Sequence, residues 1–191
     1  NLHRIVVSDA SAEQAARIFP FSFTDSPFPE DLWAFLEEAE GTTGARFVAI
    51  PHNSNLSKGW MFDTKSLRGK PIDEDYATTR ARWEPIAEIT QIKGDSETHP
   101  DLSPDDPYAD YELYPYYLAK GGSEPYVASP GDYLRGALKR GLEIENEIGV
   151  NPYQLGFIGS TDSHSGLSSA EEDNFHGKMA LDSIPERKAA R

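Results

Sequence analysis

The sequence predicts an α/β fold in which helices cover a sheet of mainly parallel strands. Short apolar runs rich in Ile, Val and Phe recur along the chain and end at Gly, Pro, Asn or Ser, which is typical of interior strands. These runs cover residues 5–7, 47–50, 86–92 and 155–158. Helical patterns lie between the runs, and strands that alternate with helices indicate parallel pairing.

Two segments carry the clearest helical patterns. Apolar side chains recur at helical spacing within residues 32–39, and Gly41 is placed to end that helix. A second helix is predicted over residues 130–148, because Ser129 can cap its start and Gly149 can end it.

Residues 94–130 differ from the rest of the chain. They are rich in Pro, Asp, Ser and Tyr and carry Tyr108, Tyr111, Tyr114, Tyr116 and Tyr117. Such rings suit packing or contact with a substrate. We therefore predict a long irregular excursion over one face of a single domain that spans residues 1–191.

The composition argues against several classes of binding partner and of chemical site. With 18 basic and 32 acidic residues, the formal net charge is −14, which repels nucleic-acid phosphates and anionic membranes and attracts divalent cations. The absence of Cys excludes disulfides, thiolate metal sites and cysteine nucleophiles, and no apolar run approaches the roughly 20 residues that cross a bilayer. We expect a soluble protein, cytoplasmic or periplasmic; its oligomeric state is not predicted.

Polar residues with metal-binding side chains lie in or just after three of the predicted strands. The histidines and carboxylates are His52, Glu88, Glu97, His99, Asp162 and His164, and Asn53 and Lys93 lie among them. Because the C-terminal ends of parallel strands meet at one mouth of an α/β fold, we expect these side chains to converge.

The Asp162-Ser163-His164 loop is the sharpest local signal. A carboxylate and an imidazole together suit Zn, Mn or Fe(II), with water in an open coordination position. The alternative is an ordinary polar turn with an Asx-type hydrogen bond from Asp162.

The other candidates have structural alternatives of their own. His52 could be a cap or loop histidine, His99 an exposed loop residue, and Glu88 a partner of Arg80 or Arg82. The sequence contains no nucleophile elbow, phosphate-binding loop, dinucleotide fingerprint or helical zinc motif.

Several longer motifs resemble a bacterial family labelled domain of unknown function 3604. The motifs are Asn1-Leu2-His3-Arg4, Ile50-Pro51-His52-Asn53-Ser54-Asn55-Leu56-Ser57, Gln91-Ile92-Lys93-Gly94-Asp95-Ser96-Glu97-Thr98-His99-Pro100, Gly159-Ser160-Thr161-Asp162-Ser163-His164 and Glu172-Asp173-Asn174-Phe175. That family is similar to the PHP (polymerase and histidinol phosphatase) superfamily of metal-dependent phosphoesterases.

The resemblance implies part of a distorted (β/α)7 barrel with two or three divalent metal ions. By likeness of position, His52 and His99 would share one metal, while Asp162 and His164 would bind the others. The superfamily's first His-x-His, a further histidine and a bridging glutamate would precede Asn1, so we expect the chain to be the C-terminal part of a longer protein.

We therefore expect a metal-dependent hydrolase of a small anionic ester, with phosphoesters as the first class. Its water would be activated by Zn, Mn or Fe ions, and Asp162 and His164 would be the catalytic residues. The residues expected near the substrate or behind the ligands are His3, Asn53, Glu88, Lys93 and Glu97. The alternatives are a non-catalytic module that binds a cation or a glycan, and a metallohydrolase of sulfate esters, amides or lactones.

Overall fold

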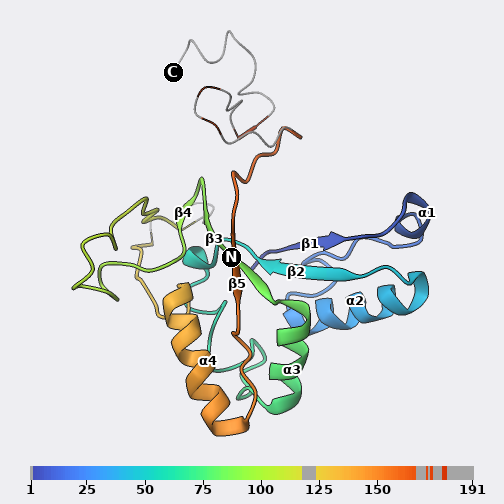
Figure 1. Cartoon of the computed structure of the whole chain (residues 1–191), viewed down its shortest axis with the longest axis horizontal. Helices are drawn as coiled ribbons and strands as arrows, with labels where there is room; N and C mark the ends of the chain where they lie inside the picture. Colours follow the sequence, from blue (N-terminus) through green and yellow to red (C-terminus); the bar gives the residue numbers. More distant parts are fainter. Residues whose placement is uncertain (1, 118–123, 167–170, 172, 174–177, 180–191) are drawn as a thin grey trace.

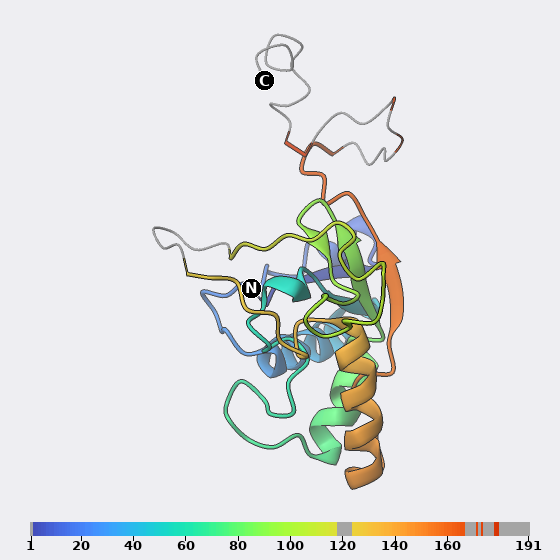
Figure 2. The same ribbon diagram turned by 90° about the vertical axis from the view of Figure 1, so that its left-hand side faces the viewer.

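The chain is described here by a computed structural model that covers residues 2–117, 124–166, 171, 173, 178 and 179. The elements in chain order are β1 (Arg4–Ser8), α1 (Ala12–Ala15), α2 (Pro29–Thr43), β2 (Phe47–Pro51), the 3-10 turn η1 (Ser54–Leu56), α3 (Glu74–Trp83), β3 (Ile86–Gln91), β4 (Gly94–Asp95), α4 (Leu134–Ile148) and β5 (Gly156–Gly159). The three long helices α2, α3 and α4 lie on the same side of the strands (Figure 1), and the view turned by 90° agrees (Figure 2).

The strands form two small sheets. In the first, β1 pairs with β2 in antiparallel fashion, with Arg4 opposite Pro51. In the second, β3 lies between β4 and β5 and is antiparallel to β4 but parallel to β5. The four predicted strands are found in place, but the prediction of mainly parallel pairing is wrong. At one end of the first sheet, the carboxylate of Asp9 accepts the backbone and side-chain N–H groups of Arg46 at 2.7 and 2.8 Å and so joins the end of β1 to the start of β2.

The prediction of part of a (β/α)7 barrel is also wrong. In the described residues, β2 and β3 belong to different sheets and no barrel closes around them. A barrel needs one continuous ladder of hydrogen-bonded strands around its axis, and the described strands are too few to supply it. The four residues of β5 are all exposed, unlike the buried strands of a barrel wall.

The helices differ from prediction mainly at their ends. The helix through residues 32–39 continues past Gly41 as α2 and ends at Gly44, whose φ of 72° is the left-handed cap conformation. Helix α4 starts at Leu134, because residues 129–132 form a turn first, and it ends at Gly149 as predicted. Helix α3, capped by Asp73, was not predicted. None of the described helices is long and apolar enough to cross a membrane.

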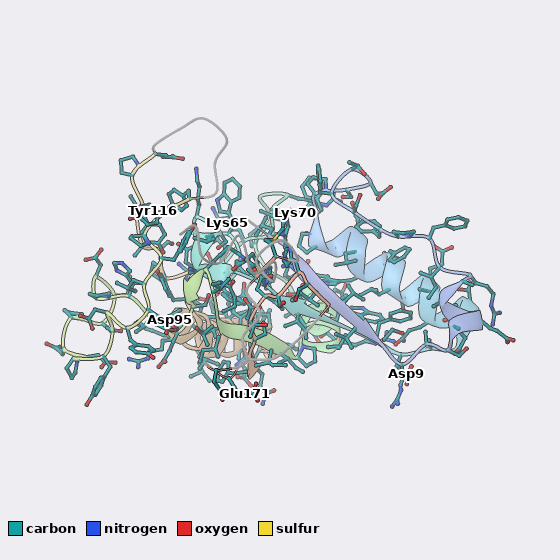
Figure 3. The ribbon with its side chains drawn as sticks, turned by 90° about the horizontal axis from the view of Figure 1, so that it is seen from above. Asp9, Lys65, Lys70, Asp95, Tyr116 and Glu171 are labelled. Carbon is teal, nitrogen blue, oxygen red and sulfur yellow. The ribbon has the colours of Figure 1, made fainter. Side chains whose placement is uncertain are left out.

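The excursion begins with β4, and its described residues beyond β4 form turns and irregular backbone without a helix or strand. Residues 118–123 lie outside the described part. Its start is packed tightly, since a Cβ added to Gly94 would lie 2.7 Å from the Cβ of Tyr114. Figure 3 places Tyr116 and Asp95 at the opposite end of the molecule from Asp9, which follows β1.

Two apolar clusters hold the helices against the sheets. The larger cluster comprises Met61, Phe62, Ile72, Ala77, Ala87, Leu134, Ala137, Ile144 and Tyr153. The smaller one comprises Trp33, Leu36, Ala49 and Trp83. Thus α3 and α4 pack near β3, while α2 packs near β2.

A buried carboxylate, Glu84, joins β1, α2 and α3. Glu84 is completely buried and accepts hydrogen bonds from Arg4 Nε at 2.8 Å and Trp33 Nε1 at 3.0 Å. A second guanidinium, that of Arg80, lies 3.0 Å away. Burial alone would raise the pKa of Glu84, but the charges of Arg4 and Arg80 outweigh burial and hold that pKa below its ordinary value.

We expect Glu84→Gln to lower the free energy of unfolding by about 3–5 kcal/mol, because it leaves two buried guanidinium groups without their counter-charge. Urea denaturation followed by circular dichroism measures the change. The matched control is Glu37→Gln, since Glu37 is 70% exposed and lies 3.7 Å from Arg82; its effect should stay within about 1 kcal/mol. Equal losses in the two variants would contradict the role given to Glu84.

Candidate functional site

Four basic side chains gather around the carboxylate of Asp162. Its Oδ1 lies 3.1 Å from His164 Nε2 and 3.6 Å from His52 Nε2. Its Oδ2 bonds directly to the ammonium groups of Lys93 and Lys178. We call these five residues the Asp162 cluster. The side chain of Asp162 is 8% exposed, so these contacts are made largely out of water.

The ends of three strands bring the cluster together. His52 directly follows β2, Lys93 follows β3, and Asp162 follows β5. Because β3 and β5 are parallel neighbours, their C-terminal ends lie side by side (Figure 2), and Lys93 meets Asp162 there. Asp162 itself has a left-handed φ of 51°, so the chain turns sharply after β5.

His52 is held from behind by Glu88 on β3. Nδ1 of His52 lies 2.8 Å from Glu88 Oε2, and both side chains are buried. The same carboxylate accepts the N–H of Asn53 and the hydroxyl of Ser160, each at 3.3 Å. A carboxylate only accepts, so Nδ1 carries the ring proton and Nε2 keeps a lone pair that points toward Asn53 and Asp162. The alternative pairing of Glu88 with an arginine is not seen, since Arg80 binds Glu84.

The electrostatics of the cluster favour bound negative charge. Burial would raise the pKa of Asp162, but hydrogen bonds from Lys178, Lys93 and His164 hold that pKa well below its usual range. Burial lowers the pKa of Lys93, although its bond to Asp162 acts in the opposite direction. The pKa of His3 is lowered by burial first and then by the nearby charge of His52. The chain is acidic as a whole, yet basic side chains lie together around Asp162.

Two predicted site residues lie elsewhere. The ring of His99 packs between Tyr126 and Tyr133, with ring centres 5.8 and 5.9 Å apart, and its Nδ1 is 3.4 Å from Asp101. Glu97 forms an ion pair with Arg135 at 2.6 Å. Within the described residues, no hydrogen bond or ion pair joins His99 to the Asp162 cluster, so the metal shared by His52 and His99 stays a prediction.

Lys178 is the cluster residue that the sequence does not predict. It lies in a segment without helical or strand periodicity. It reaches Asp162 because the backbone of His164 donates to Lys178 O at 2.6 Å, in a short bridge beside Met179. Its contact with Asp162, which lies 16 residues earlier in the sequence, is seen only in the structure.

The donor atoms of the cluster fit a metal ion only in part. Donor atoms that share an ion at about 2.1 Å are about 3–3.4 Å apart, close to the separations from Asp162 to the two imidazoles. However, in the part of the chain that the structure describes, no three His, Asp or Glu side chains converge on one point suited to an ion. The second oxygen of Asp162 is also bound by ammonium groups. The described residues supply the right donor types without completing a metal centre.

The depressed pKa of Asp162 predicts a pH dependence of stability. Since the folded state favours the charged form, the stabilisation is complete above the unfolded pKa of about 3.9 and is lost as the pH falls through the folded value. We expect the difference in unfolding free energy between wild type and Asp162→Asn to be constant from about pH 8 to 5 and to shrink below about pH 4. Urea titrations in metal-free buffer test this. The exposed Asp110→Asn serves as control, and a difference that grows on acidification would refute the assignment.

Comparison with known proteins gives one match. A sequence model of the family described as "Protein of unknown function (DUF3604)" matches residues 1–191. No curated protein and no solved structure matches the chain.

Proposed function

Because the chain belongs to the DUF3604 family, whose description states no activity, we propose from the geometry that it is a hydrolase of anionic esters, with phosphoesters as the first class. One observation carries the proposal: two imidazoles and two ammonium groups meet on the single carboxylate of Asp162. In a chain with a formal net charge of −14, this gathers four basic side chains at one place. Such a spot attracts anions and stabilises negative charge that develops on them.

The charge balance of the cluster leaves room for an anion. Lys93 and Lys178 carry two positive charges when protonated, and Asp162 compensates one of them, whereas the other nearby carboxylate, Glu88, binds the opposite nitrogen of the His52 ring. A phosphoryl oxygen placed beside the two ammonium groups would neutralise the remaining charge through charge-assisted hydrogen bonds. Asp162 then acts as the positioning residue that keeps both lysines at the same place.

His52 is the best-placed general base. Glu88 holds its Nδ1–H, which fixes the ring, and Nε2 would take the proton of a water that displaces the side-chain amide of Asn53. The water oxygen would form the new bond to phosphorus while the bond from phosphorus to the alcohol oxygen breaks. His164, held beside Asp162 at 3.1 Å, is placed to give the leaving oxygen a proton. The pairing of a carboxylate with an imidazole resembles the base–orienter arrangement of other hydrolases.

A metal-dependent form of this activity is supported by the motifs' resemblance to the PHP superfamily and by the donor types of His52, Asp162 and His164. A bound Zn, Mn or Fe ion would lower the pKa of its water toward neutrality. Because the described residues do not complete a coordination sphere, metal dependence is a separate question for experiment.

We expect Asp162→Ala to lower phosphoester hydrolysis by at least about 100-fold, since it releases both lysines and removes the partner of His164. The assay is a panel of phosphate mono- and diesters, with sulfate esters, an amide and a lactone as further classes. Asp110→Ala, an exposed aspartate on the excursion, is the matched control. Parallel assays after chelation and after re-addition of Zn, Mn or Fe determine the metal requirement. An Asp162→Ala variant with the wild-type rate would exclude the site.

We expect Glu88→Gln to reduce kcat by about 10–100-fold, because it loosens the orientation of His52 without touching the substrate. Glu143→Gln, exposed on α4, is the control. Thermal unfolding of both variants separates a loss of activity from a loss of fold. Unchanged kcat in a folded Glu88→Gln variant would rule out His52 as the oriented base.

A second candidate function, a glycan-binding module, is favoured by three exposed rings of the excursion. Tyr108, Tyr111 and Tyr116 are 81%, 69% and 65% exposed. Exposed aromatic rings of this kind can stack on sugars. Binding of oligosaccharides without turnover of any ester in the panel would support this function over hydrolysis.

A further inference from the structure

A cavity of about 480 Å³ lies between the segment before α2, the start of β1 and Trp60. Its volume is in the range of small-molecule sites, about 300–1,000 Å³. Its walls are mostly apolar and include Val6, Phe21, Phe23, Phe28, Leu32 and Trp60. The charged or polar part of the lining comes from His3, Arg4, Ser22 and Ser26.

The cavity adjoins the Asp162 cluster through His3. This residue lines the cavity, and its backbone carbonyl accepts the N–H of His52 at 3.0 Å. The charges of His52 and Lys93 also act on the His3 side chain. His3 therefore contacts both the cavity and the backbone that carries one imidazole of the cluster.

One wall of the cavity is held in place. The Arg68 guanidinium lies 3.8 Å from the ring centre of Phe28 and forms an ion pair with Asp31 at 2.7 Å. Phe21 stacks on Phe35 with ring centres 5.2 Å apart. These contacts pre-form the aromatic wall before a ligand arrives.

Two other rings of the lining are exposed to solvent. Phe23 is 80% exposed and Trp60 is 55% exposed, although both line the cavity. A planar aromatic group would bury these rings and gain offset or edge-to-face contacts with them. The several aromatic rings of the lining therefore favour a ring over a flexible chain as the occupant.

We propose that this cavity is a subsite for an aromatic ring, so that the substrate class is an aryl phosphate with its anionic end at Lys93 and Lys178 and its ring against Phe23, Phe28 and Trp60. The anionic end rests on the proposed function, whereas the ring subsite rests on the cavity alone. Hydrolysis would form a bond from water oxygen to phosphorus and break the bond from phosphorus to the aryl oxygen. The products are a phenol and inorganic phosphate.

Isothermal titration calorimetry of the purified chain with phenyl phosphate, phenol and inorganic phosphate tests the proposal, with Trp60 fluorescence as a second readout. We expect phenyl phosphate to bind about tenfold more tightly than either fragment, equivalent to about 1.4 kcal/mol. Phe23→Ser should weaken phenyl phosphate and phenol about tenfold and leave inorganic phosphate unchanged. Phe19→Ser is the matched control, since Phe19 is 86% exposed but does not line the cavity.

Different results would contradict the ring subsite and the proposed function. Lys93→Ala should weaken phenyl phosphate and inorganic phosphate but not phenol. If phenol binds through Phe23 while Lys93→Ala has no effect and no ester is hydrolysed, the ring subsite stands and the proposed function falls. If phenyl phosphate binds no more tightly than inorganic phosphate, or if Phe19→Ser and Phe23→Ser have equal effects, the ring subsite is overturned.

Discussion

The buried carboxylate of Glu84, shared by Arg4 and Arg80, is the interaction on which the rest of the structure depends. It fixes β1 against α2 and α3 in a region where an unpaired charge would be costly. The position of Arg4 in turn fixes His3, whose carbonyl holds the backbone of His52. A structural ion pair thus positions both the cavity wall and one imidazole of the candidate site. The contacts that stabilise the fold at Arg4 therefore also position the candidate site, because His3 directly precedes Arg4.

Strand pairing and a tight turn of the backbone together position the candidate site. The parallel pairing of β3 and β5 brings Lys93 and Asp162 together across 69 residues of sequence. The left-handed turn at Asp162 then aims its carboxylate back at the strand ends rather than into solvent. Because Glu88 lies on β3 and Lys93 in the turn directly after it, the group that orients His52 and the lysine that faces Asp162 are both positioned by that strand. A basic cluster can therefore persist inside an acidic protein.

The sequence predicts local features of this molecule better than long-range ones. Apolar runs locate four strands, and the residues after them include His52, Lys93, Asp162 and His164, because alternation and strand ends are local properties. The direction of the β1–β2 pairing is not local, since the pairing joins strands that are separated in the sequence by α1 and α2. The barrel was implied by the family resemblance alone, and the described strands instead form two separate sheets. Lys178 carries no pattern at all, and only the fold shows its contact with Asp162.

The close contact at Gly94 joins the excursion to the candidate site. Gly94 follows Lys93 directly and has a φ of 96°, and its α-carbon faces the backbone of Glu112 and the side chain of Tyr114 so closely that a methyl group would not fit. The loop therefore packs directly against the residue that follows the lysine facing Asp162. A side chain at position 94 would displace either the loop or the backbone beside that lysine, so the fit between them restricts this position to glycine.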